Sequence, residues 1–154
     1  MNWKGRRRSW TDNLLWHHGC HLVDAALWVL GGEADPGTVR AQFGTTHPVL
    51  GIPLDLNLQF RVGSVLVTVA MSYNSPWPRH EYLVIGEEGC LEYRDGCLWN
   101  QSGLVYEPPV TDPIRAQDEE WLAAIREERE PEVSPAAVLP AMRLLGAAQA
   151  QAAA

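Results

Sequence analysis

The sequence has 154 residues, of which 46% are hydrophobic and 20% are charged, and its formal net charge is −7. This length supports one domain with a buried core, and the acidic balance excludes a general nucleic-acid-binding protein. No stretch is as apolar as a membrane span of roughly 20 residues, and three cysteines with no CxxC pair or signal peptide predict reduced thiols in a cytoplasmic protein.

The composition along the chain predicts three regions. We expect a basic N-terminal arm over 1–11, a single α+β domain over 12–146 and a frayed Ala/Gln tail over 147–154. The arm carries the run Lys4-Gly-Arg6-Arg7-Arg8, which we interpret as a solvated segment. A small anion clamp is the alternative interpretation, because arginine pairs well with carboxylates.

The segment 14–30 is apolar on nearly every side and predicts one long buried helix, which Gly31 and Gly32 end. Four chemically active residues at positions i, i+3, i+4 and i+7 share one stripe of that helix: His17, Cys20, His21 and Asp24. Buried polar groups need partners. The stripe therefore either joins an internal network or lines a cleft, and a cleft with two imidazoles and a carboxylate is a candidate site.

Alternating apolar and polar residues then predict strands. The expected strands cover 39–43, 54–61, 65–73, 80–85, 90–94 and 97–100, with a further short one at 104–106. Asp95-Gly96 is a strong signal for a two-residue hairpin turn. The loop over 74–79 carries Trp77 at its tip, where it forms either a plain connection or the rim of a pocket. We expect the other apolar-patterned tryptophans to lie mostly in the core: Trp16, Trp28, Trp99 and Trp121.

Two helices complete the predicted fold. One begins near Pro113 to Asp118 and includes Trp121, and the last begins at Ser134-Pro135, which has the form of an N-cap followed by proline. The expected fold is α+β, with an open, mostly antiparallel sheet of about five or six strands and helices packed on one face. An apolar sheet face left uncovered predicts a homo-oligomer, most simply a homodimer.

The motif His17-His-Gly-Cys-His21-Leu-Val-Asp24 before Gly31-Gly32 resembles the "D-x-G-x-H-x-x-D … L-x-G" segment of the glucose-fructose oxidoreductase/inositol dehydrogenase/MocA (Gfo/Idh/MocA) oxidoreductases. The glycine turn over 86–89 and the closing helices are also similar to that family. The resemblance covers nearly the whole chain but only the family's C-terminal, substrate and oligomerisation half. The segment 9–21 is most like the 4-carboxy-2-hydroxymuconate semialdehyde dehydrogenase branch.

The resemblance implies roles for these residues. His21 is the expected acid/base residue on a substrate hydroxyl, His17 an auxiliary contact where many relatives have Asp, and Asp24 a partner that orients the His21 ring. The expected substrate contacts are His18, Trp77, Arg79 and His80, and the arginine suits a small anionic substrate.

The family's nucleotide-binding half has no counterpart in this sequence, because no strand–G-x-G-x-x-G–helix unit is present. We expect no cofactor on this chain alone; NAD(P) is implied by the resemblance, held by a separate dinucleotide-binding chain or domain. Whether the chain is an enzyme is therefore open, and it resembles part of a dehydrogenase that is inactive in hydride transfer by itself.

Two alternatives remain open at this point. His17, Cys20, His21 and Asp24 have ligand types and helical spacing suited to Zn or another divalent metal, which would make the chain a standalone metal-binding protein or metalloenzyme. In the second alternative, the polar residues of the stripe only satisfy one another's hydrogen bonds, and the chain is a non-catalytic oligomerisation module.

Overall fold

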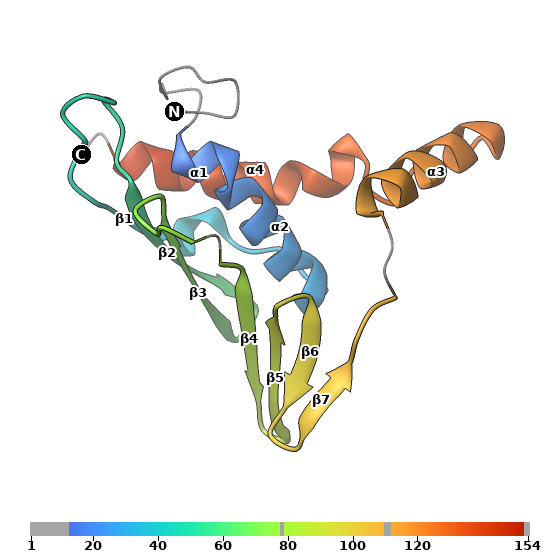
Figure 1. The fold of residues 1–154 in the computed structure, drawn as a ribbon. Coiled ribbons are helices and arrows are strands. Elements are labelled where there is room, and N and C mark those ends of the chain that lie inside the picture. Colours follow the sequence, from blue (N-terminus) through green and yellow to red (C-terminus); the bar gives the residue numbers. More distant parts are fainter. Residues whose placement is uncertain (1–12, 78, 110–111, 153–154) are drawn as a thin grey trace. The chain divides into compact units, whose positions relative to one another are not determined.

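A computed structural model describes residues 13–77, 79–109 and 112–152 of the chain, so the predicted basic arm lies outside the described residues. The chain divides into two compact units, which we describe separately (Figure 1). Unit 1 consists of 1–74 with 133–154, and unit 2 consists of 75–132. That the two units act as one domain over 12–146 stays a prediction.

The described residues form helices and antiparallel strands, so the predicted α+β class is confirmed. The helices are α1 (Leu14–His17), α2 (Gly19–Leu30), α3 (Pro113–Arg126) and α4 (Pro135–Gln151), and one turn of 3-10 helix lies at Pro36–Thr38. The strands are β1 (Arg40–Phe43), β2 (Asp55–Val62), β3 (Val65–Ser72), β4 (Glu81–Gly86), β5 (Gly89–Arg94), β6 (Cys97–Asn100) and β7 (Gly103–Tyr106). They form a three-stranded and a four-stranded sheet, where the sequence predicted one sheet of five or six strands.

The predicted helix over 14–30 is interrupted at His18, which corrects the expectation of one continuous helix. Asn13 begins α1, because its side-chain oxygen accepts a hydrogen bond from the backbone N–H of Leu15 at 2.8 Å. The residues around the interruption are His17, His18 and Gly19, and histidine and glycine have weaker helix propensity than leucine or alanine. The predicted end is confirmed, because Gly31 adopts a left-handed conformation with φ of 63°.

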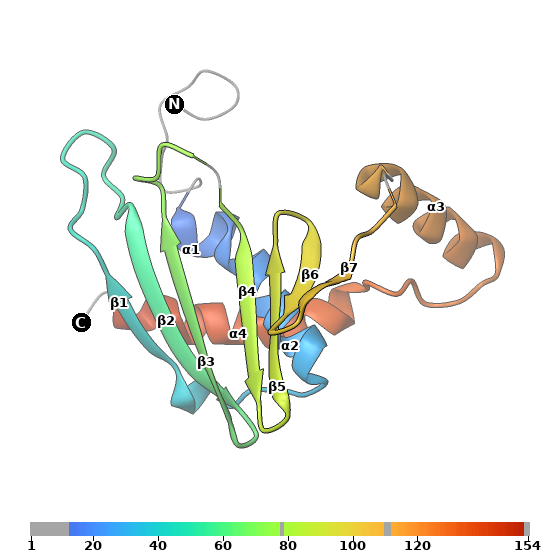
Figure 2. The ribbon, with the colours of Figure 1, turned by 60° about the horizontal axis from the view of Figure 1, so that its bottom comes forward.

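Unit 1 is built on the sheet β1-β2-β3, whose strands pair antiparallel in chain order. The even-numbered residues of β2 are buried and its odd-numbered residues are exposed, as the alternating pattern predicted. Helices α1, α2 and α4 cover the buried face (Figure 2). Phe60, Leu15 and Leu145 are each at most 1% exposed, and burying one such side chain contributes about 1.5–3 kcal/mol.

Helix α4 ends later than the sequence predicted, because the expected frayed tail over 147–154 is helical as far as Gln151. Ser134 caps its start through a hydrogen bond from the backbone N–H of Ala137, as the sequence predicted. Two features hold its last turns. Ala148 is fully buried, and the Gln151 amide donates to the Val39 carbonyl and accepts from the Ala41 N–H, both at 2.9 Å.

Unit 2 contains the sheet β4-β5-β6-β7 and helix α3. The predicted hairpin turn is confirmed, because Asp95 and Gly96 both have positive φ, 53° and 81°. Ala124 is the only described residue of unit 2 that is fully buried, and both sheet faces expose apolar side chains. The most exposed are Leu83, Ile85, Leu91, Leu104, Val105 and Tyr106.

The placement of tryptophans in the core was largely wrong. Trp16, Trp28 and Trp121 are 40%, 80% and 58% exposed, and only Trp99 is half-buried. Apolar periodicity identifies the residues that bind an apolar surface, but it does not reveal whether that surface lies within the described chain. None of the described helices is long and apolar enough to cross a membrane.

Candidate functional site

The most distinctive polar cluster of unit 1 lies at the interruption between α1 and α2. His17 ends α1, His18 lies at the interruption and Gly19 begins α2. Gly19 is buried, and a Cβ added there would lie 3.4 Å from both Leu145 and Met71. The chain therefore packs closely against the core at this point, which fixes the backbone that carries the two histidines.

A tyrosine from the end of β3 completes the cluster. The Tyr73 hydroxyl lies 2.7 Å from Nδ1 of His17, a hydrogen bond between residues 56 positions apart in sequence. The ring centroids of Tyr73 and His18 are 5.3 Å apart at an angle of 73°, and those of His17 and His18 are 4.4 Å apart. The structure thus adds Tyr73 to the adjacent pair His17 and His18, whose roles stay predictions.

Sequence analysis missed Tyr73 as a site residue, because it continues the apolar face of a strand whose other members are Val65, Val67, Val69 and Met71. The sequence signal that could have identified Tyr73 is its polar hydroxyl at the end of an otherwise apolar strand face. Buried or half-buried tyrosine hydroxyls usually find a hydrogen-bond partner.

Hydrogen bonds around Asp55 hold the segment that carries Tyr73. Asp55 accepts from the Ser72 hydroxyl at 2.6 Å and from the Asn74 side-chain amide at 2.8 Å. The backbone N–H of Tyr73 donates to the Leu54 carbonyl at 2.7 Å. Residues on both sides of Tyr73 are therefore attached to the start of β2, which limits the positions that the phenol ring can take.

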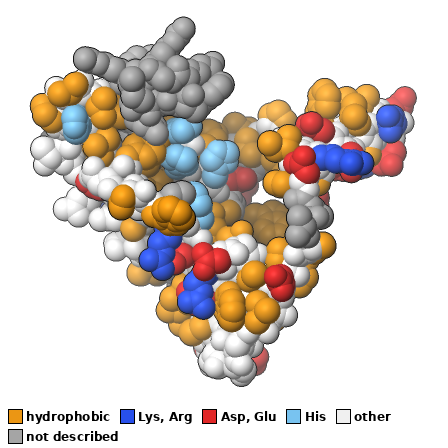
Figure 3. Space-filling view, viewed as in Figure 1, with side chains coloured by type: hydrophobic (Ala, Val, Ile, Leu, Met, Phe, Trp, Pro, Cys, Tyr) orange, Lys and Arg blue, Asp and Glu red, His pale blue; other side chains and the backbone are white. Residues whose placement is uncertain are grey.

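The predicted four-residue stripe does not act as one unit. The Cys20 thiol donates to the backbone carbonyl of His17 at 3.8 Å, His21 is exposed and Asp24 is half-buried. Figure 3 shows histidine side chains on the surface over α1 and α2. Across the described chain no hydrogen bond joins the His21 ring to Asp24, so the expected orienting contact is not formed here.

The alternative metal site receives no support. No group of three or more His, Cys, Asp or Glu side chains in the described part of the chain is arranged to hold a metal ion. The interruption at His18 explains why, because it separates His17 from the helix that carries Cys20, His21 and Asp24. A regular helical spacing across 17–24 was the premise of that hypothesis.

The remaining predicted contacts, Trp77, Arg79 and His80, belong to unit 2. Trp77 is 76% exposed and His80 is exposed, while the guanidinium of Arg79 pairs with Glu81 at 2.7 Å. This surface ion pair contributes little to stability, and a competing carboxylate can replace it at modest cost. The role of these three residues in substrate binding stays a prediction.

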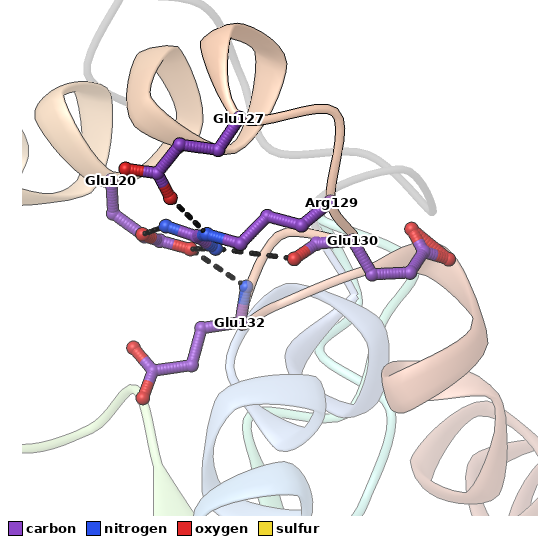
Figure 4. Close-up of polar contacts among 5 residues, drawn as sticks. All are labelled: Glu120, Glu127, Arg129, Glu130 and Glu132. Atoms are coloured by element: carbon purple, nitrogen blue, oxygen red, sulfur yellow. Dashed lines mark hydrogen bonds and ion pairs between the residues drawn. The ribbon is translucent and has the colours of Figure 1, made fainter.

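Unit 2 contains a second polar cluster, which the sequence did not predict (Figure 4). Arg129 donates to both carboxylate oxygens of Glu120, at 2.6 and 2.9 Å, and to Glu127 at 2.7 Å. Glu120 also accepts from the backbone N–H of Glu132 at 2.9 Å. The hydrogen bonds from Arg129, followed by that from Glu132, lower the pKa of Glu120 from 4.5 to about 2. This cluster is an ion-pair clamp on the segment after α3.

The described residues do not fit a dinucleotide. All strand pairs among them are antiparallel, whereas a dinucleotide-binding unit needs parallel strands joined through a helix that follows a glycine-rich turn. Gly31 and Gly32 follow a helix instead of preceding one. The described residues therefore contain no dinucleotide-binding unit of that form.

Comparison with known proteins gives three consistent findings. The family model described as "Bacterial oxidoreductases, C-terminal" matches residues 1–97. The chain is 36% identical over 157 residues to the 4-carboxy-2-hydroxymuconate-6-semialdehyde dehydrogenase of Sphingobium sp. strain NBRC 103272 / SYK-6, a match that covers 98% of this chain and 49% of that protein. The chain thus spans about half the length of the curated relative.

Solved structures share the fold. An oxidoreductase from Agrobacterium radiobacter in complex with NAD+, L-tartaric acid and magnesium gives a TM-score of 0.74 at 19% identity, over 91% of this chain and 47% of that one. GenD2 from gentamicin A biosynthesis, in complex with NAD, gives 0.76 at 18% identity, over 96% of this chain and 48% of that one. At these identities the likeness concerns the fold alone.

Proposed function

The chain belongs to the family of bacterial oxidoreductase C-terminal domains, and on that premise we propose that it is the substrate-side part of an NAD(P)-dependent dehydrogenase. The substrate class is a small carboxylated or sugar-like molecule oxidised at a hydroxyl or hemiacetal carbon. The observation that carries this proposal is the 36% identity to a semialdehyde dehydrogenase over almost the whole chain, including the histidine segment of α1 and α2.

His21 is the proposed acid/base residue. Its ring is exposed on α2, so a substrate hydroxyl can reach it, and imidazole exchanges protons near neutral pH. His17 and His18 lie one helical turn earlier and provide polar contacts to the same substrate. Asp24 lies three residues further along α2 and is the proposed partner that orients the His21 ring.

Trp77, Arg79 and His80, in unit 2, are proposed separately as substrate contacts. The Arg79 guanidinium is 73% exposed and suits a carboxylate, with which it can form two parallel hydrogen bonds. The proposed hydride acceptor is the nicotinamide ring of a dinucleotide held by a separate domain or chain. Every group that this chain contributes therefore serves to bind the substrate or to move its proton.

We also propose that the chain associates with a second copy through the sheet of unit 2. Leu83 and Ile85 lie on one face of β4 and are 63% and 74% exposed, and contiguous apolar surface of this kind marks protein–protein contacts. Light scattering should give the mass of a dimer, and Ile85→Asp should reduce it to that of a monomer. The control is Val49→Asp, at a residue that is 62% exposed in a loop of unit 1. A monomeric wild-type chain would refute self-association.

The test of the dehydrogenase proposal is reconstitution. The chain would be mixed with the separately produced part of the Sphingobium relative that it does not cover, NAD+ or NADP+, and 4-carboxy-2-hydroxymuconate-6-semialdehyde, and reduced cofactor would be followed by absorbance. We expect His21→Ala to lower the rate by a factor of about 100 to 10,000, as for other acid/base residues.

The matched control is His47→Asn. His47 accepts hydrogen bonds from the backbone N–H groups of Val49 and Leu50 at 3.2 Å, and an asparagine side chain can accept them too. This variant should retain the wild-type rate. Equal rates for the wild type and His21→Ala would remove His21 from the mechanism.

A further inference from the structure

We propose that Tyr73 is a positioning residue for His17: its hydroxyl holds Nδ1, so that the ring presents its Nε2–H to a carboxylate oxygen of the substrate. This inference rests on the proposed function for the identity of the ligand. The contact between Tyr73 and His17 does not depend on the proposed function. The contact and the identity of the ligand are tested in separate experiments.

The hydrogen bond between the two side chains has a preferred direction. The Tyr73 hydroxyl and Nδ1 of His17 are 2.7 Å apart, which is the usual length of a strong bond from a hydroxyl. A phenol, with a usual pKa of about 10, is a better donor than the N–H of a neutral imidazole, whose bare ring nitrogen is in turn a good acceptor. In the proposed arrangement the phenol donates to Nδ1, and the ring proton of His17 lies on Nε2.

The other edge of the His17 ring faces away from Tyr73. Nδ1 and Nε2 lie on different edges of the imidazole, so a ring whose Nδ1 contacts the phenol directs Nε2 elsewhere. His17 is exposed, which leaves Nε2–H accessible to a ligand. In this arrangement His17 is a hydrogen-bond donor to the substrate, whereas the proposed acid/base role belongs to His21.

The surroundings of Tyr73 are suited to a positioning role. Asp55 holds Ser72 and Asn74 on either side of it, and the backbone N–H of Tyr73 is bonded to Leu54. His18 packs its ring against the phenol at 5.3 Å. A phenol held at its backbone and along its ring can fix the orientation of a partner better than a solvent molecule can.

The Nε2–H group of His17 can donate a hydrogen bond to an acceptor oxygen of the substrate. Hydrogen bonds to an ionised acceptor are roughly twice as strong as those between neutral groups, so a carboxylate is the favoured ligand over an amide or an ester carbonyl. In this proposal Tyr73 affects the specificity of the site through His17.

Nuclear magnetic resonance of the chain with 15N-labelled histidine tests the positioning role without any catalysis. At about pH 8.5, well above the usual histidine pKa of about 6.5, the shifts of the two ring nitrogens give the ratio of the neutral tautomers. We expect His17 to be almost entirely in the Nε2–H form. Tyr73→Phe should change that ratio by roughly fivefold, the equivalent of one net hydrogen bond.

His47 is an internal reference, because the two backbone N–H groups that point at its Nδ1 require the Nε2–H form in every variant. Tyr106→Phe, which removes the hydroxyl of a 52% exposed tyrosine in unit 2, is the matched control and should leave His17 unchanged. A change in the His47 signals would reveal that Tyr73→Phe unfolds the chain. In that case the variant His17→Gln is used instead, with the ring carbons of Tyr73 labelled. Loss of the His17 ring should then shift the carbon signals of the Tyr73 phenol. A His17 ratio equal in the wild type and Tyr73→Phe overturns the inference, as does an Nδ1–H form in the wild type.

The ligand is tested with fumarate, a dicarboxylate, and with fumaramide, its neutral diamide. Fumarate should move the Nε2 signal of His17, with several-fold weaker binding in Tyr73→Phe and little effect from fumaramide. Absence of a fumarate effect, or equal effects of the two probes, overturns carboxylate recognition. Failure of the reconstituted dehydrogenase together with the expected tautomer result would refute the proposed function alone.

Discussion

Gln151→Ala should destabilise unit 1, although the residue lies in a segment that the sequence predicted to be frayed. The Gln151 side chain makes two hydrogen bonds at the start of the edge strand β1, one with Ala41 and one with Val39 just before the strand, both at 2.9 Å. Two such bonds contribute about 1–2 kcal/mol to the free energy of unfolding. For a chain of this size the loss corresponds to a fall of about 3–6 °C in the unfolding midpoint.

The assay is thermal unfolding followed by circular dichroism, with Gln117→Ala as the matched control. Gln117 is an exposed residue of helix α3, so its replacement should change stability by less than about 0.5 kcal/mol. Removing Gln151 should also increase hydrogen exchange at the N–H of Ala41, because that group then lies on an open sheet edge. Equal thermal unfolding midpoints for the two variants would refute this reasoning and favour the prediction that the segment 147–154 is frayed.

Three further predictions concern the core, the ion-pair clamp and the base of the tyrosine segment. Leu145→Ala should lower the free energy of unfolding by about 2–5 kcal/mol in a urea titration, and Leu139→Ala in the same helix by far less, because the first side chain is fully buried and the second is 48% exposed. The pKa of Glu120 lies below 4.5, at about 2, through its bonds with Arg129, so its stabilising effect is complete above pH 4.5 and is lost as the pH falls through about 2. Glu120→Gln should remove that part of the pH dependence, and identical acid profiles for variant and wild type would contradict the clamp. Asp55→Ala should cost about 1 kcal/mol and release the end of β3, which faster hydrogen exchange at 72–74 would reveal.

The strands were predictable because their signals are local. The alternation of Leu56, Leu58 and Phe60 with polar residues predicted which face of β2 is buried, and Asp95-Gly96 predicted its turn. Ser134-Pro135 placed the start of α4 in the same way. Each of these signals depends on residues within a few positions of one another, which is the range that periodicity and capping describe.

The candidate site was predictable only in part, because it depends on contacts between distant segments. Periodicity placed His17 on a stripe with Asp24, but the interruption at His18 separates them, and the partner of His17 is Tyr73. The exposed Trp28 shows the same limit. Its apolar character predicted burial, whereas nothing in the described chain covers it.

The central claim is that this chain supplies the substrate side of a dehydrogenase, and the most direct measurement is cofactor reduction by the reconstituted pair. Equal amounts of the chain and of the part of the Sphingobium relative that it does not cover, with 4-carboxy-2-hydroxymuconate-6-semialdehyde and NAD+ or NADP+, should reduce the cofactor, while each part alone should not. A demonstrated complex of the two parts that leaves both cofactors oxidised would contradict the account.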